Sequence, residues 1–175
     1  MALDATPSGT AANTYLSDVE FTTYAAGSLS SSRVSASTSD TRERALRTAT
    51  RMIDRLLFDG EATVYAQALQ WPRRSVTDPD RWGYSLSEVA IPRRVREASA
   101  EMALALLGEG EASPDAALSD SALYTRAKVD VLEVEYRDGA AMATDAVGVL
   151  RRYPAVWALL APLTESAGRM EVARA

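Results

Sequence analysis

Apolar residues recur every three to four positions between residues 40 and 57, and arginines occupy the positions between them. A repeat near 3.6 residues is typical of an amphipathic α-helix that buries one side. Asp40 and Glu43 can cap the start of this helix, and Asp59–Gly60 can end it, because glycine tolerates the left-handed conformation. The apolar positions are Ala45, Leu46, Ala49, Met52, Ile53, Leu56 and Leu57, and the arginines are Arg42, Arg44, Arg47, Arg51 and Arg55.

A second apolar face is predicted in the segment IPRRVREASAEMALALLGEG. Pro92 suits the first turn of a helix, and Val95, Ala98, Met102 and Leu106 continue the helical repeat before Gly108. Each of the two helices has an apolar stripe that needs cover. We therefore expect them to pack together as the core.

Two shorter helices are predicted nearer the ends of the chain. Ser17 and Glu20 form a capping box, which starts a helix over residues 18–25. Pro154 can start another of about two turns that ends near Pro162. Between the first of these and the helix from Asp40, the serine-rich residues 27–39 predict a loop, because serine side chains compete for backbone hydrogen bonds.

The run AKVDVLEVEYRDG alternates polar and apolar residues and ends in the turn signal Asp138–Gly139. The adjacent Val131 and Leu132 change the phase of the alternation, which predicts a bulge or a tight reversal and hence a small hairpin. The predicted fold is mainly α, a small helical bundle with an added β-hairpin or strand pair. One domain, residues 15–163, holds the long loop 59–91 and the strand region 126–137, between flexible ends at 1–14 and 164–175.

Composition narrows the possible functions. The chain of 175 residues has a net charge of −5 and contains no cysteine and no histidine. Standard serine, cysteine and zinc hydrolase schemes therefore lack their parts, and we expect neither catalysis nor a cofactor. The acidic balance weakens non-specific binding to DNA phosphates over the chain as a whole, so any nucleic-acid contact must be local. Neither a signal peptide nor a membrane-spanning run is evident, and we expect no membrane partner.

The segment from Trp71 to Arg96 is the main candidate for binding. Six arginines and three carboxylates give it a local surplus of three positive charges, with Trp71 and Trp82 interleaved. Arginine beside aromatic side chains is one way to grip single-stranded nucleic acid. The alternative, which we favour, is that Trp71 anchors the loop in the core and the arginines pair with acidic neighbours or another subunit.

Two acidic pairs have simpler explanations than chemistry. Asp78–Pro79–Asp80 offers too few oxygen ligands for a magnesium or calcium site, and proline between aspartates favours a turn. Glu133 and Glu135 share one face of the predicted strand but have no apolar pocket to separate their pKa values. We expect no metal site, and a solvated strand face.

The order of YLSDVEFTTYAAG, RALRTATRMIDRL, ALQWPR, IPRRVREASAEMALALL, KVDVLEVEYRDG and YPAVWALLAPL resembles the head-tail adaptor proteins of long-tailed double-stranded DNA phages. Relatives of these adaptors are often catalogued as DnaT-like single-stranded DNA-binding proteins. The resemblance spans residues 15–163. It departs at Val129–Leu132, where those relatives usually place a Gly-Pro turn before the strand.

The resemblance implies a virion structural protein at the head-tail junction, assembled in the host cytoplasm as a ring expected to be twelve-fold. Its partners would be further copies of itself, the portal protein and a tail-proximal connector or stopper, with genomic double-stranded DNA passing through the channel without specific binding. In such a ring Trp71 and Pro72 would be loop anchors, and the interface arginines would be Arg73, Arg74, Arg93, Arg94, Arg169 and Arg174. The alternative function is a single-stranded DNA-binding replication accessory protein.

Overall fold

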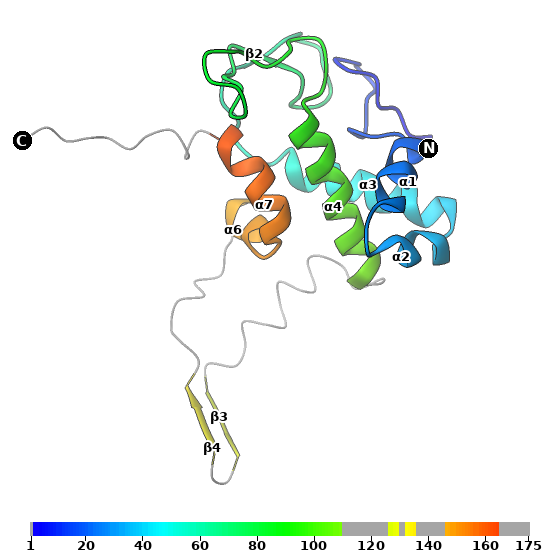
Figure 1. Cartoon of the computed structure of the whole chain (residues 1–175), viewed down its shortest axis with the longest axis vertical. Helices are drawn as coiled ribbons and strands as arrows, with labels where there is room; N and C mark the ends of the chain where they lie inside the picture. The colour runs from blue at the N-terminus through cyan, green and yellow to red at the C-terminus, as the bar shows by residue number, and fades with distance from the viewer. Residues whose placement is uncertain (1, 110–125, 130–131, 136–145, 165–175) are drawn as a thin grey trace, which may run out of the picture.

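The computed structural model describes residues 2–109, 126–129, 132–135 and 146–164. The chain is mainly helical, with short antiparallel strand pairs, as the sequence predicts (Figure 1). The helices are α1 (Asp18–Ala26), α2 (Ser31–Ala36), α3 (Ser39–Ile53), α4 (Arg93–Glu109), α6 (Ala146–Arg151), α7 (Pro154–Leu160) and the 3-10 turn η1 (Ala161–Leu163). The strands are β1 (Glu61–Ala62), β2 (Arg73–Arg74), β3 (Arg126–Val129) and β4 (Leu132–Glu135).

Helices α3 and α4 pack against each other and form the centre of the core, which confirms the predicted pairing of the two apolar stripes. α7 packs against α4, and α1 and α2 also contact α4 (Figure 1). The side chains buried in this centre are Leu46, Ala49 and Ile53 from α3, Val95, Ala98 and Met102 from α4, and Val156 and Leu160 from α7. α4 is therefore the element that the other helices share.

The bounds of α3 differ from the prediction at both ends. The cap predicted at Asp40 was wrong, because the Thr38 hydroxyl accepts a hydrogen bond from the backbone N–H of Thr41 at 3.2 Å and caps the helix, which begins at Ser39. It ends at Ile53, well before the glycine, and the chain continues in turns. Leu56 stays buried there, but Leu57 is exposed, so its placement on the buried face was wrong.

The first part of the chain is more helical than predicted. The capping box of α1 is confirmed, since Ser17 and Glu20 bond each other's backbone N–H groups. The serine-rich connector contains α2, which buries Val34, whereas the sequence predicts a loop. The reason is tertiary: the Arg33 guanidinium of α2 donates to the carbonyl of Leu104 in α4 at 3.3 Å.

Gly108 does not end the second long helix as predicted, because α4 continues through it to Glu109. A Cβ atom at Gly108 would lie 2.2 Å from Nη1 of Arg33. The glycine thus makes room for the arginine of α2.

The strand prediction is confirmed as an antiparallel pair in which Val129 of β3 faces Leu132 of β4. Residues 130–131, which belong to the predicted bulge or tight reversal, lie outside the described residues. Pro154 occupies the first turn of α7, also as predicted. The short helix α6 has no counterpart in the sequence prediction, and the predicted C-terminal tail beyond Thr164 lies outside the described residues.

Residues 2–14, for which the sequence predicts flexibility, are tied to each other by hydrogen bonds. Asn13 accepts from the backbone N–H of Asp4 at 3.1 Å and donates to the carbonyl of Ala2 at 3.0 Å. Just beyond them, the buried hydroxyl of Tyr15 donates to the carboxylate of Asp54 at the end of α3. Burial raises the pKa of Tyr15 well above its usual value, and it also raises the pKa of Asp54.

Replacing Tyr15 with phenylalanine leaves the Asp54 carboxylate without this donor. Losing a partner of a mostly buried polar group costs about 1–3 kcal/mol, so Tyr15→Phe is expected to lower the free energy of unfolding by that amount. The matched control is Tyr24→Phe, because the Tyr24 hydroxyl donates to Glu101 at a more exposed site. Urea denaturation measures both. Equal losses in the two variants would contradict a special role for the Tyr15–Asp54 bond.

Candidate functional site

The connection between α3 and α4 is the part of the chain that most needs explanation. Residues 59–91, which we call the loop layer, form one end of the molecule beyond the helices (Figure 1). Trp71 inserts into the core with 1% of its surface exposed, and its ring meets Phe58 edge-on at 5.4 Å between centroids. The Trp71–Pro72 peptide is cis, and Pro72 is also buried. The centre of the loop layer is therefore attached to the helices by an indole ring.

Arg73 ties the loop layer together from inside. Its guanidinium donates to the carbonyls of Phe58, Asp59 and Gly60 at 3.0, 2.8 and 2.5 Å, and to the Gln70 side chain at 2.6 Å. These backbone carbonyls would otherwise need water. Arg73 thus provides hydrogen-bond donors to the carbonyls of a turn in its own chain. Sequence reasoning had assigned Arg73 to an interface.

A glycine and a strand pair fix the same turn. β1 pairs with β2 so that Glu61 faces Arg74. Gly60 has a φ of +74°, and a Cβ atom there would lie 2.2 Å from the carbonyl oxygen of Arg74. Only glycine fits where the two segments approach so closely.

The second half of the loop layer folds back on itself. The backbone N–H of Asp78 donates to the carbonyl of Tyr84 at 2.8 Å, and that of Leu86 donates to Val76 at 2.9 Å. The Asp78 side chain accepts from the N–H of Asp80 at 2.9 Å, which is the turn geometry that the sequence favoured over a cation site. The exposed chain between Val76 and Leu86 is consequently held in one shape.

Most arginines of the Trp71–Arg96 segment are occupied by carboxylates of the same chain. The ion pairs are Arg74–Glu61 at 2.6 Å, Arg93–Glu97 at 2.7 Å, Arg96–Glu20 at 3.3 Å, and Arg94–Asp80. The hydrogen bond from Arg94 lowers the pKa of Asp80. The local positive surplus seen in the sequence is therefore largely neutralised, as expected if these arginines pair with acidic neighbours.

Apolar side chains are instead what the loop layer exposes. Trp82 is 98% exposed and Tyr84 is 69% exposed. The large hydrophobic residues of this kind in the loop layer, which we call the apolar set, are Val64, Tyr65, Trp82, Tyr84 and Val89. Sequence reasoning noted Trp82 only as a neighbour of arginines; its place beside Gly83, in a run of turn residues, was the available signal of exposure.

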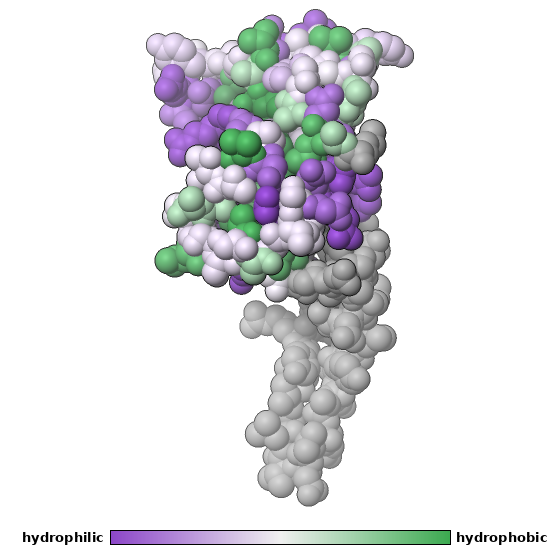
Figure 2. Space-filling view, turned by 90° about the vertical axis from the view of Figure 1, so that its right-hand side faces the viewer, coloured by the Kyte–Doolittle hydropathy of each residue, from purple (hydrophilic) through white to green (hydrophobic). Residues whose placement is uncertain are grey.

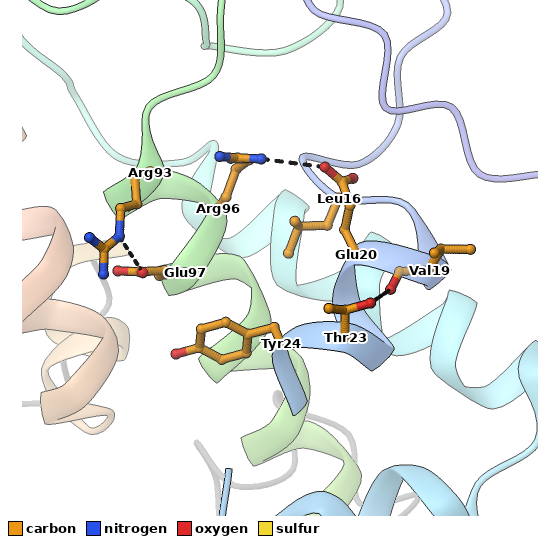
Figure 3. Close-up of a pocket in the computed structure, with 8 residues that line it drawn as sticks. All are labelled: Leu16, Val19, Glu20, Thr23, Tyr24, Arg93, Arg96 and Glu97. Carbon is orange, nitrogen blue, oxygen red and sulfur yellow. Dashed lines mark hydrogen bonds and ion pairs between the residues drawn. The ribbon is translucent and has the colours of Figure 1, made fainter. Parts of the chain in front are cut away.

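An open groove of ≈ 390 Å³ lies between α1 and α4 (Figure 3). Arg96 of α4 reaches across to Glu20 of α1, and Arg93 pairs with Glu97 beside it. Burial and the bond to Glu101 raise the pKa of Tyr24, whose ring also lines the groove. Its charged groups are thus paired with one another, and the Arg96–Glu20 pair links α4 to α1. The face drawn in Figure 2 mixes hydrophobic and hydrophilic side chains and shows no continuous apolar surface.

The remaining sequence-predicted residues can now be placed. Trp71 and Pro72 lie in the core, while Arg73, Arg74, Arg93 and Arg94 contact groups of their own chain. An interface role for these four arginines stays a prediction. Arg169 and Arg174 lie outside the described residues.

The described part of the chain contains neither a group of metal ligands nor a membrane-spanning helix. No group of three or more acidic side chains there converges in a way that could hold a metal ion. Among the same residues, no helix has both the length and the apolar character needed to cross a bilayer.

The described residues form a small, mainly helical protein with an ordered loop layer between α3 and α4. The chain belongs to the family described as "Putative DnaT-like ssDNA binding protein", which matches residues 1–175. This description agrees with the alternative function from the sequence analysis, and it makes no mention of a phage adaptor. Neither a curated protein nor a solved structure matches the chain.

Trp71 is buried and Trp82 is exposed, so the two side chains are expected to contribute very differently to the free energy of unfolding. Trp71→Ala is expected to lower the free energy of unfolding by about 3–5 kcal/mol, because it empties a buried site the size of an indole. Trp82→Ala, the matched control, is expected to change it by less than about 0.5 kcal/mol. Chemical denaturation of both variants checks this. A small loss for Trp71→Ala would show that the loop layer is held by other contacts.

Proposed function

We propose that this protein is a phage head-tail adaptor, a non-catalytic subunit that assembles as a ring under the portal and joins the capsid to the next connector. The observation that carries the proposal is the apolar set, displayed by a loop layer in which Arg73 and Arg74 already bond groups of their own chain. A surface of this kind favours contact with protein. The order of the motifs along the sequence is what resembles the phage adaptors.

The physical argument concerns the cost of binding. Exposed aromatic side chains contribute large buried area when a partner covers them, and tryptophan and tyrosine are enriched at the centres of interfaces. Association is weakened when loops must first become ordered. Here Trp71, Arg73 and Gly60 hold the loop layer in shape before any partner arrives, so the apolar set is presented with little further ordering.

Charge supports the same proposal. The chain has a net charge of −5, and its paired arginines leave few free cations in the Trp71–Arg96 segment. A channel through which DNA slides works better when its wall does not hold phosphates strongly. An acidic subunit suits that task. The ring, its expected twelve-fold symmetry and the portal partner are parts of this proposal.

A second candidate is a single-stranded DNA-binding accessory protein, which the family description favours. In this case Trp82, Tyr84 and Tyr65 would be stacking platforms for bases, since aromatic side chains bind single strands with little sequence preference. Arg81 beside Trp82 could contact a phosphate. The same apolar set therefore serves two different partners in the two candidates.

The adaptor proposal predicts that removing Trp82 and Tyr84 abolishes assembly. The purified protein, alone and with its portal protein, is studied by light scattering and negative-stain imaging. We expect rings or portal-dependent particles for the wild type and for Leu29→Ala, whose side chain is equally exposed but lies outside the loop layer. Trp82→Ala/Tyr84→Ala is expected to stay dispersed with an unchanged melting temperature. A wild type that ignores the portal and never forms rings would contradict the proposal.

The stacking candidate predicts a different response from the same variants. Each base stacked on an aromatic ring contributes about 1–3 kcal/mol, so Trp82→Ala/Tyr84→Ala would weaken binding of a labelled single strand by roughly tenfold or more. Fluorescence anisotropy measures this. Unchanged affinity would remove the loop layer as a base-stacking site, whatever the outcome of the assembly experiment.

A further inference from the structure

The outer face of α3 carries a row of arginines that the proposed function does not use. α3 buries Leu46, Ala49 and Ile53 completely, which makes it a rigid platform. On its solvent side, Arg44, Arg51 and Arg55 are all exposed. These three residues, which we call the α3 arginine row, were seen in the sequence only as the polar side of an amphipathic helix.

Helix geometry aligns the row. Seven residues fall about 20° short of two full turns, so Arg44 and Arg51 share a narrow strip of α3, and Arg55 follows in the turn directly after the helix. Arg55 lies beyond Ile53, but Asp54 keeps helical backbone angles of −65° and −11°, which extends the turn toward it. From Arg44 to Arg55 the rise is about 16 Å.

Two members of the row are free of acidic partners. Arg44 pairs with Asp40 at 3.1 Å, in a fully solvent-exposed setting. Within the described residues, neither Arg51 nor Arg55 forms an ion pair or a side-chain hydrogen bond. This distinguishes them from the arginines of the Trp71–Arg96 segment, where Arg74, Arg93, Arg94 and Arg96 are paired with carboxylates.

Asp54, the carboxylate nearest to these two arginines in sequence, bonds to other groups. Its side chain accepts hydrogen bonds from the Tyr15 hydroxyl and, at 3.4 Å, from the backbone N–H of Gln70. The Asp54 carboxylate is mostly buried. Its charge is thus turned away from the strip that Arg51 and Arg55 share. The buried bond that ties the N-terminal segment to α3 leaves the row positive.

We propose that the α3 arginine row binds the phosphodiester backbone of DNA without reading its sequence. A guanidinium makes forked, charge-assisted hydrogen bonds to phosphate oxygens, which an ammonium cannot match. A row of about 16 Å runs along roughly five phosphates at the spacing of one strand of a duplex, about 3.4 Å each. This local contact operates despite the net charge of −5. The inference rests on the DNA-binding candidate and is independent of adaptor assembly.

The experiment measures binding of full-length protein to labelled DNA by anisotropy, between roughly 50 and 200 mM salt. One arm uses a single strand of about 30 nucleotides and the other a duplex of the same length, since both present the same backbone. The test variant is Arg51→Gln/Arg55→Gln. The matched control is Arg74→Gln/Arg93→Gln, which removes the same charge from the Trp71–Arg96 segment at two arginines that pair with Glu61 and Glu97.

For Arg51→Gln/Arg55→Gln, losing two phosphate contacts is expected to reduce the slope of log affinity against log salt by about 1.4 on the single strand and about 1.8 on the duplex. The ratio of wild-type to variant affinity for the single strand is therefore expected to be roughly sevenfold larger at the low-salt end than at the high-salt end. The control variant is expected to keep the wild-type slope. Melting temperatures of both variants verify that each is folded.

Three results would overturn the inference. The wild type does not bind either DNA; or the control variant loses as much affinity as the test variant, which would indicate net charge alone; or only the control weakens, which would place the contact in the loop layer. None of these results depends on whether the protein forms rings. Failure here therefore leaves the adaptor proposal to its own experiment.

Discussion

Burial of the Trp71 side chain is the interaction on which the rest of the molecule depends. More than thirty residues connect α3 to α4 with only four of them in strands, and such a connection has many backbone groups to satisfy and little core of its own. The indole supplies that core by packing on Phe58 between the helices. Arg73 then satisfies the carbonyls of the adjoining turn, so one apolar and one cationic side chain hold the whole connection.

This arrangement divides the side chains of one segment between two tasks. Trp71 faces inward and stabilises, whereas Trp82 faces outward and is available to a partner. The arginines follow a similar division: most form internal ion pairs, Arg42 and Arg47 of α3 among them, whereas Arg51 and Arg55 are exposed and form none within the described residues. A protein of acidic net charge can in this way present an apolar surface at one end and a narrow basic strip along one helix. The two surfaces need not serve the same partner.

The sequence predicts the helices well where the apolar repeat is long, as in α3 and α4, because burying a stripe decides the structure. It correctly predicts the cap at Ser17 and the helix start at Pro154, where the residue type itself carries the geometry, but it places the cap of α3 at Asp40 and not at Thr38. The sequence predicts a loop where α2 forms, because that helix depends on the contact of Arg33 with α4. It also predicts a helix end at Gly108, whereas this glycine makes room for the same arginine. Such long-range contacts leave no periodic signal.

The same limit applies to the candidate sites. A positive surplus in the Trp71–Arg96 segment was visible in the sequence, but its neutralisation by Glu61, Asp80, Glu97 and Glu20 depends on contacts up to 76 residues apart. Exposure of Trp82 likewise follows from the fold-back of the chain at Asp78 and Tyr84. Residue types made the segment a candidate for binding; only the contacts indicate which side chains remain available.

Hydrogen–deuterium exchange shows whether the loop layer is a surface for protein partners. Amide exchange is followed along the chain with and without the portal protein. If the loop layer contacts the portal protein, amide exchange is expected to slow within residues 76–89, which carry Trp82 and Tyr84, when that protein is present. Exchange that is unchanged in these residues while the rest of the chain becomes protected would contradict it.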